Sequence, residues 1–198
     1  MEKINVKTKF STRQMAMVGM LSAVSIFLGL TGLGFIPIPP VKATIMHIPV
    51  IVGAIIEGPI VGALVGAVFG LFSMYQSFTT PLPTSFIFWN PIIALLPRIL
   101  IGIVSYYVYV FFKNKFKKQS ISIAISAIIG TLTNTIGVMG LTYIIYLEKY
   151  ANVLGISKSA ATIGIGGVVV TNGSIEAIVS AVISIPIVIT LLKINRNN

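Results

Sequence analysis

The chain has 198 residues, of which 56% are hydrophobic and only 9% are charged, whereas soluble domains carry about 25% charged residues. A chain this apolar cannot cover itself with polar surface, so lipid must be its solvent. It contains no cysteine, one histidine and four acidic residues, which excludes thiolate chemistry, leaves little material for acid–base catalysis, and predicts no metal site and no cofactor.

Apolar runs of about 20 residues, the length that spans a bilayer, follow one another along the chain. The predicted spans cover residues 14–34, 60–76, 91–112, 119–147 and 161–192. A shorter run at 43–57, which ends before a Gly-Pro turn, is too short to cross upright and is expected to form a sixth, short helix. The sequence therefore predicts one domain, residues 1–198, with an all-α integral membrane fold: a six-transmembrane-helix bundle.

The basic residues predict the orientation of this bundle. Ten of them lie at the two termini and in the loop after residue 112, whereas Lys42, Lys149 and Lys158 lie in the remaining loops. Cytoplasmic loops are enriched in Lys and Arg, so both termini are expected in the cytoplasm, with the chain in the cell membrane. The net charge of +10 is thus interpreted as a topology signal, and no nucleic-acid partner is expected.

Small residues recur at helical spacing in two of the spans. One row has four glycines, each four residues after the last: Gly58, Gly62, Gly66 and Gly70. Such a row makes a groove into which another helix packs closely, and contact within the chain is the favoured interpretation. In the first span, Gly19 and Ala23, with Ala16 nearby, form a second small-residue face. That face fits either packing inside the bundle or the docking of another membrane protein.

Polar side chains lie at similar depth in three spans. Arg98 is about 12 Å below the outer mouth at ~1.5 Å per residue, the next span carries Thr131 and Asn134, and the last carries Asn172 and Glu176 on one face. A charge at the bilayer centre costs at least ~2.5–3.5 kcal/mol, so Arg98 must face a partner or a cavity. Two interpretations stay open: an ion pair with Glu176 that joins two helices, or a cavity in which Arg98 binds an anionic or polar ligand group.

The loops on the predicted outer side are long and carry aromatic and basic residues. Trp89 and Asn90, preceded by several phenylalanines, lead into the fourth helix, and Tyr143 lies at the adjoining end of the fifth. They are expected to form an interfacial aromatic belt or a lid over a ligand site. Lys42, in the first outer loop, is placed to attract an anion. The single histidine, His47, is expected to be a hydrogen-bonded structural residue.

Four stretches of the chain resemble the substrate-binding S components of energy-coupling factor (ECF) vitamin transporters. They are VKATIMHIPVIVGAIIEGPIVGALVGAVFGLFS (Val41–Ser73), LLPRILIGIVSYYVY (Leu95–Tyr109), IIGTLTNTIGVMGLTYI (Ile128–Ile144) and VVVTNGSIEAIVSAVI (Val168–Ile183). The resemblance implies a six-helix bundle with cytoplasmic termini and a vitamin site near the outer face, built from helices four to six and the outer loops. It also implies a chain that hydrolyses nothing itself, topples in the membrane, and has a T component and two ATPase subunits as partners.

The resemblance also bears on the substrate and on docking. HIPVIVGAIIEGPIVGALVGAVFGL and TNTIGVMGLTYI are most similar to pantothenate-type members, for which Arg98 and Lys42 suit the carboxylate and the Asn and Thr groups suit the hydroxyls and amide. Family members often dock the T component through Ala-x-x-x-Ala on the first helix, and here the match shifts from Ala16 to the pair Gly19 and Ala23.

Several alternatives stay open. The alternative substrates of such an S component are riboflavin, a pyridoxine-like compound and a hydroxymethylpyrimidine. Outside this family, the chain is a stand-alone secondary transporter or an intramembrane lipid-modifying enzyme. Inverted repeats typical of many secondary transporters are not evident, and the few acids and single histidine disfavour the enzyme.

Overall fold

The computed structural model describes residues 10–38 and 41–197. The helices of this part of the chain are α1 (Thr12–Thr31), α2 (Ile48–Glu57), α3 (Pro59–Thr79), α4 (Pro91–Phe116), α5 (Gln119–Leu154) and α6 (Lys158–Asn197). A short 3-10 helix, η1 (Ser85–Trp89), precedes α4. Two strands, β1 (Phe35–Ile38) and β2 (Val41–Thr44), form an antiparallel hairpin between α1 and α2.

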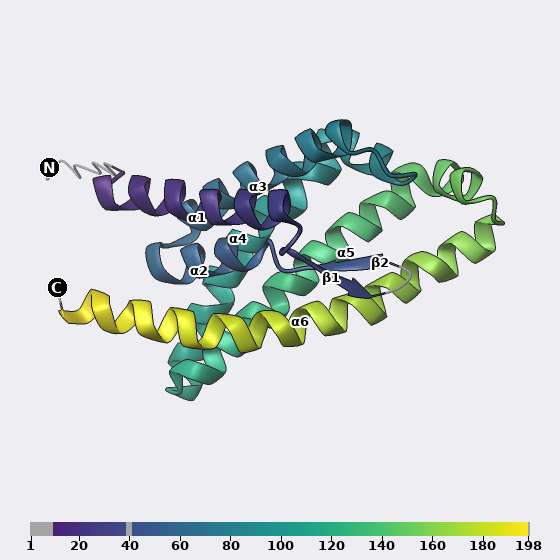
Figure 1. The fold of residues 1–198 in the computed structure, drawn as a ribbon. Helices are drawn as coiled ribbons and strands as arrows, with labels where there is room; N and C mark the ends of the chain where they lie inside the picture. Colours follow the sequence, from purple (N-terminus) through teal and green to yellow (C-terminus); the bar gives the residue numbers. More distant parts are fainter. Residues whose placement is uncertain (1–9, 39–40, 198) are drawn as a thin grey trace, which may run out of the picture.

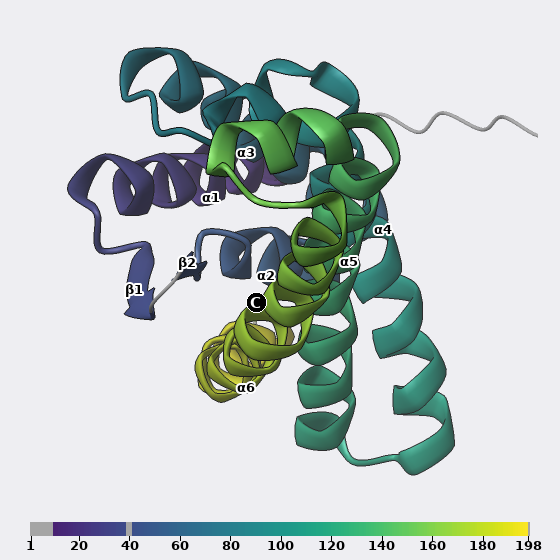
Figure 2. The same cartoon turned by 90° about the vertical axis from the view of Figure 1, so that its right-hand side faces the viewer.

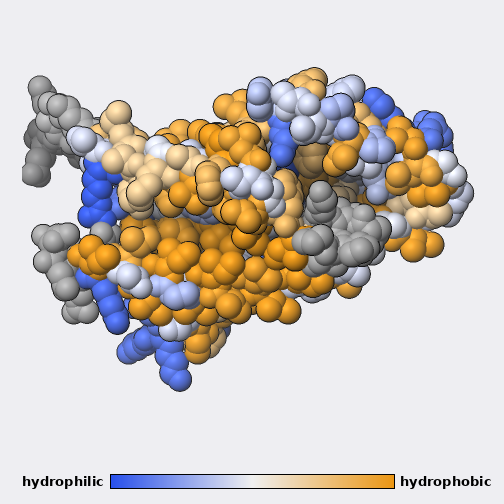
Figure 3. Space-filling model, in the orientation of Figure 1, coloured by the Kyte–Doolittle hydropathy of each residue, from blue (hydrophilic) through white to orange (hydrophobic). Residues whose placement is uncertain are grey.

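Five of these helices, α1, α3, α4, α5 and α6, are long and apolar enough to cross a membrane, and α2 is the short sixth. The predicted five spans and short helix are therefore confirmed. Figure 3 shows hydrophobic residues spread over α1 and α6, with hydrophilic residues gathered near the helix ends. A surface of this kind fits lipid along the length of the bundle and water at its ends.

The helices alternate in direction, so the bundle has two distinct ends. α1 begins and α6 ends at the same end of the molecule, at the left of Figure 1, and the α2–α3 and α4–α5 turns also lie toward it. We call this the terminal end. The β1–β2 hairpin, η1 and the α5–α6 turn lie toward the other end, which we call the loop end (Figure 1).

The short helix α2 lies at the centre of the bundle. Figure 2 shows it between the α1–α3 layer and α6, and it contacts α1, α3, α4, α5 and α6. Most of its side chains are buried, because IPVIVGAIIE is apolar around the whole helix and every face has a neighbour. Residues at the start of α2 are thus held near the axis of the bundle.

The glycine row packs α3 against α4. A Cβ added at Gly66 would lie 2.2 Å from the carbonyl oxygen of Arg98, and one added at Gly62 would lie 2.9 Å from the Cα of Gly102. Gly70 similarly faces the carbonyl of Ala94. Gly58 differs, because its φ of 103° makes the sharp turn between α2 and α3 rather than a packing surface. The close-packing prediction therefore holds for the three glycines inside α3.

The ends of most elements differ by a few residues from the sequence prediction, and three of the differences bear on the site. The first outer loop, predicted without regular structure, contains the β1–β2 hairpin, which pairs Phe35 with Thr44 and contacts α6 through β2. The predicted helix at 43–57 begins only at Ile48, after this hairpin. α5 continues seven residues past its predicted end at 147, because the backbone bends at Tyr146 (φ −128°, ψ 15°) and helical geometry then resumes to Leu154.

Candidate functional site

Arg98 is a buried cation whose position follows from the residue before it. Pro97 has no backbone N–H, so the carbonyl of Ile93, four residues earlier, lacks its helical hydrogen-bond partner. The Arg98 side chain is only 5% exposed, and its Nη1 donates to that carbonyl oxygen at 2.8 Å. The dipeptide Pro-Arg therefore creates a free acceptor inside α4 and supplies the donor that satisfies it.

Aromatic rings complete the surroundings of the guanidinium. Its central carbon lies 4.9 Å from the ring centroid of Phe88 in η1 and 5.6 Å from that of Phe69 in α3. Contacts of this kind stabilise a desolvated cation by about 2 kcal/mol. The Nε atom of Arg98 has no hydrogen-bond partner within the described residues. The guanidinium is thus sheltered from lipid but keeps donor capacity for a ligand.

The packing of α4 against α5 places Asn134 near the level of Arg98. A Cβ on Gly137 would meet Pro97 at 3.0 Å, and one on Gly130 would meet the Ser105 hydroxyl, so the antiparallel helices are in a fixed register. Asn134 lies between those two contacts. It is 5% exposed, and its Oδ1 has no hydrogen-bond partner among the residues that the structure describes.

Beside Asn134, hydrogen bonds join α2, α5, α6 and the hairpin. His47, fully buried at the start of α2, is 2.8 Å from the Thr131 hydroxyl through its Nε2. Thr135 donates to Glu176 Oε2 at 3.0 Å, and the backbone N–H of Thr44 donates to Glu176 Oε1 at 2.7 Å. We call these five residues, together with Arg98, Asn134 and Asn172, the polar cluster.

The expected ion pair between Arg98 and Glu176 is not formed. Within the described residues, the salt bridges are Arg13–Glu57 and Lys158–Glu148. Both carboxylate oxygens of Glu176 instead accept hydrogen bonds from Thr44 and Thr135, although its charge still attracts Arg98 through space. No carboxylate among the described residues therefore forms an ion pair with Arg98, and ligand binding by Arg98 stays a prediction.

The structure separates the remaining predicted site residues. Asn172 is 3% exposed on α6 and belongs to the polar cluster. Asn90 instead caps α4, accepting a hydrogen bond from the N–H of Ile92. Tyr143 is 45% exposed and lies away from the cluster. Lys42 lies on β2, opposite Pro37, but its side chain is outside the described part of the chain.

Trp89 anchors η1, the segment that carries Phe88, to the end of α3. Its ring stacks on Phe78 with centroids 5.6 Å apart, and its Nε1 donates to the carbonyl of Ser77 at 3.3 Å. The Lys149 ammonium, on α5 beyond the bend, lies 4.6 Å from the ring centroid of Phe86. These contacts fasten η1 between the ends of α3 and α5, so η1 keeps Phe88 over Arg98.

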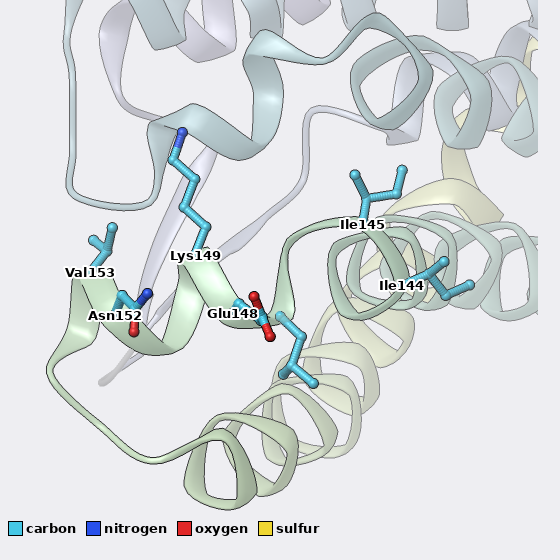
Figure 4. A pocket seen from close by; sticks show the side chains of 7 residues that line it. Ile144, Ile145, Glu148, Lys149, Asn152 and Val153 are labelled. Carbon is cyan, nitrogen blue, oxygen red and sulfur yellow. The ribbon is translucent and has the colours of Figure 1, made fainter.

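A groove of about 690 Å³ runs beside the bend of α5 at the loop end. Figure 4 shows that the lining of this groove comes from one stretch of α5. The Lys149 side chain reaches toward the segment before α4, and the Glu148 side chain points away from that segment. Arg98 and the rest of the polar cluster do not line this groove. It is a surface feature of the bend and not the candidate site.

Residues of α1 form a separate exposed face. Ala16, Gly19 and Ala23 are exposed, and a Cβ added at Gly19 would meet no atom within 4 Å. The other side of α1 packs on α2 and α3, where Ser25 donates to the carbonyl of Met46. Gly19 and Ala23 therefore lie on the outer surface of the bundle and not inside it, and docking of another membrane protein on this face stays a prediction.

Comparison with known proteins identifies the family. The model for the ECF transporter, substrate-specific component, matches residues 13–188. The chain belongs to this family of ECF transporter S components. It is 34% identical over 173 residues to the pantothenic acid transporter PanT of Lactococcus lactis subsp. cremoris, covering 80% of this chain and 82% of that relative. It is 30% identical over 158 residues to the pantothenate transporter PanT of Leuconostoc mesenteroides, covering 76% and 78%.

This membership places the polar cluster in a transporter and not an enzyme, as the acid-poor composition predicts. An S component binds its substrate and leaves catalysis to other subunits. Sequence reasoning found Arg98, Thr131, Asn134, Asn172 and Glu176, because polar residues in apolar spans stand out. It missed the partners that bring them together, the backbone N–H of Thr44 and the ring of Phe69, since neither differs from its neighbours in the sequence.

Proposed function

We propose that this chain is the substrate-binding subunit of an ATP-driven ECF transporter and that its substrate is pantothenate. The two relatives described above carry pantothenate in their names. The observation within this chain that supports the proposal is Arg98, a buried guanidinium with no carboxylate in salt-bridge contact in the described residues. A vitamin with one carboxylate supplies the missing counter-charge.

The chemistry of pantothenate matches the polar cluster group by group. Its carboxylate would accept hydrogen bonds from Arg98, whose planar guanidinium binds carboxylates with two parallel bonds. Its amide and two hydroxyls need both donors and acceptors. Asn134, with a free Oδ1, together with Thr131 and Asn172 at neighbouring positions, provides them. Riboflavin and the pyridoxine-like compounds carry no carboxylate and would leave Arg98 without a counter-ion.

Glu176 has a different role in this proposal. Its carboxylate already accepts hydrogen bonds from Thr44 on β2 and Thr135 on α5, so it links the hairpin to the bundle beside the site. A hydroxyl of the substrate would donate to it as a third partner. Lys42, on the same strand as Thr44, would draw the vitamin anion toward the loop end.

The proposed orientation puts the loop end outside the cell and the terminal end in the cytoplasm of a cell-membrane protein. The basic residues of the α4–α5 turn and the termini support this orientation through the positive-inside rule. A T component would dock on the α1 face of Ala16, Gly19 and Ala23. Two ATPase subunits would supply the energy, because the chain itself holds no nucleotide motif.

Binding of pantothenate and its alcohol analogue, in which CH₂OH replaces the carboxylate, tests this proposal. We expect the purified chain to bind the acid far more tightly than the alcohol. Arg98→Gln should weaken binding of the acid by about 2–5 kcal/mol, the cost of removing one partner of a buried charge pair. It should change binding of the alcohol little, because that analogue has no charge for Arg98 to meet.

Tyr143→Phe is the matched control, since Tyr143 is a polar residue of α5 that faces away from the cluster. Its binding of both compounds should equal that of the unaltered chain. Equal loss of acid and alcohol binding in Arg98→Gln would show that Arg98 only supports the fold. Tight binding of riboflavin or a pyridoxine-like compound in place of pantothenate would overturn the substrate, while uptake into liposomes without ATPase subunits would overturn the transporter class.

A further inference from the structure

A second groove, of about 480 Å³, opens at the terminal end, far along the bundle from Arg98. Its walls come from the α2–α3 turn, the last turns of α4 and the end of α6. One part of the lining is apolar and consists of Ile55, Ile56, Tyr106, Val110 and Leu192. The other part is polar and consists of Glu57, Tyr109, Lys113 and Asn114. A groove with this division suits a molecule that has a polar head and an apolar tail.

The phenol of Tyr109 is the observation that points to a ligand. The residue is 4% exposed, and its hydroxyl has no hydrogen-bond partner within the described residues. Buried hydroxyls nearly always have a hydrogen-bond partner, because leaving one unpaired destabilises the fold. Because Tyr109 lines the groove, a ligand there would accept the hydrogen bond that the protein itself does not.

The charges around the groove favour an anion. Lys113 lies one helical turn after Tyr109, with its ammonium 5.5 Å from the centroid of that ring, and both residues line the groove. The one carboxylate in the lining, Glu57, is already paired with Arg13 at 2.7 Å. A phenol, an ammonium and the Asn114 amide are therefore the available donors, and together they fit the oxygens of a phosphate.

We propose that this groove binds the phosphate of an anionic phospholipid, with the acyl chains lying along the apolar wall. The position at the end of the spanning segments is the depth of lipid headgroups, and the basic α4–α5 turn adds to the attraction for an anionic surface. The site is separate from the polar cluster and does not depend on which vitamin the chain binds. Free phosphate shares the headgroup chemistry, but it leaves the apolar wall uncovered.

The test measures how much phosphatidylglycerol raises the unfolding temperature of the full chain beyond what phosphatidylcholine does. We expect a clear extra rise for the unaltered chain. Tyr109→Phe, which removes one oxygen, and Lys113→Ala should each lose most of it. Lys115→Ala is the matched control. It removes the same charge two residues after Lys113, and the Lys115 side chain does not line the groove. It should keep the extra rise.

Equal losses in Lys113→Ala and Lys115→Ala would overturn the proposal, since they would indicate a diffuse surface attraction. No loss in Tyr109→Phe would overturn it too. Inorganic phosphate is the second arm, and a rise as large as that given by the lipid would show that the source is a free anion and refute the lipid assignment. The unfolding temperature in phosphatidylcholine alone, measured in parallel, should stay close to that of the unaltered chain in all three variants, which separates loss of this groove from loss of folding.

Discussion

Gly66→Ala is a one-carbon change whose effect follows from the packing of α3 on α4. The added Cβ would lie 2.2 Å from the carbonyl oxygen of Arg98 and 2.8 Å from its carbonyl carbon. Ordinary contacts are about 3.5 Å, so the gap is short by more than an ångström. The obstacle is backbone and cannot rotate away as a side chain would. The two helices must therefore move apart along their whole contact.

The expected cost is large for so small a side chain. Overpacking a core usually costs 1–3 kcal/mol, and because the backbone blocks relief here we expect about 3 kcal/mol. For a chain of this size that lowers the unfolding temperature by roughly 6–12 °C. The shift also moves Arg98, whose carbonyl is the contacted group, so pantothenate affinity should fall together with stability. Leucine at Gly62 or Gly66 should prevent compact folding altogether.

The assay is thermal unfolding of the detergent-purified chain, with pantothenate binding measured on the same samples. Gly140→Ala, on α5, is the matched control, since its added Cβ meets no atom within 4 Å. It should leave the unfolding temperature unchanged or raise it, because alanine favours a helix by about 1 kcal/mol over glycine. If both variants unfold at the same temperature, the close contact between α3 and α4 does not exist and the reasoning fails.

Two further predictions concern the polar cluster. Glu176→Leu leaves the N–H of Thr44 without its acceptor, at about 1–3 kcal/mol, while the Thr135 hydroxyl keeps the carbonyl of Thr131 at 3.3 Å. The hairpin should therefore loosen; faster amide hydrogen exchange in residues 41–46 would show it, and an unchanged rate would contradict the link. His47→Phe should destabilise the ligand-free chain by about 1–3 kcal/mol because Thr131 loses its partner. Adding Thr131→Val should recover much of that loss in thermal unfolding, and strictly additive losses would argue against the hydrogen bond.

The helices of this bundle are predictable from the sequence because lipid imposes a simple condition. Every backbone group inside the membrane must be paired within the chain, so long apolar runs become helices. The packing role of the glycines within α3 is also predictable, since a spacing of four residues puts them on one face of the helix. Gly58 shares the spacing but makes a turn, because Pro59 follows it and starts a new helix. Spacing alone does not distinguish the two uses.

The arrangement around Arg98 was only partly predictable. Opposite charges at similar depth in two spans suggest an ion pair between Arg98 and Glu176, yet backbone groups take those roles: the carbonyl of Ile93 faces Arg98 and the N–H of Thr44 faces Glu176. Side-chain patterns do not report free backbone groups, except where Pro97 removes a donor. The hairpin that carries Thr44 is likewise hidden, since a strand of four residues is too short to show a period.

The two charges of the polar cluster are therefore held by different neighbours, and this separates their roles. Glu176 has two donors from the protein, so its carboxylate stays in place whether or not a ligand is bound. Arg98 has one backbone carbonyl and two aromatic faces, none of which carries a full negative charge. Under the proposed function, a substrate carboxylate would approach Arg98 without first breaking a salt bridge. An ion pair would have made the substrate compete with Glu176 for Arg98. In the observed arrangement, the charge of Arg98 remains available to attract a ligand.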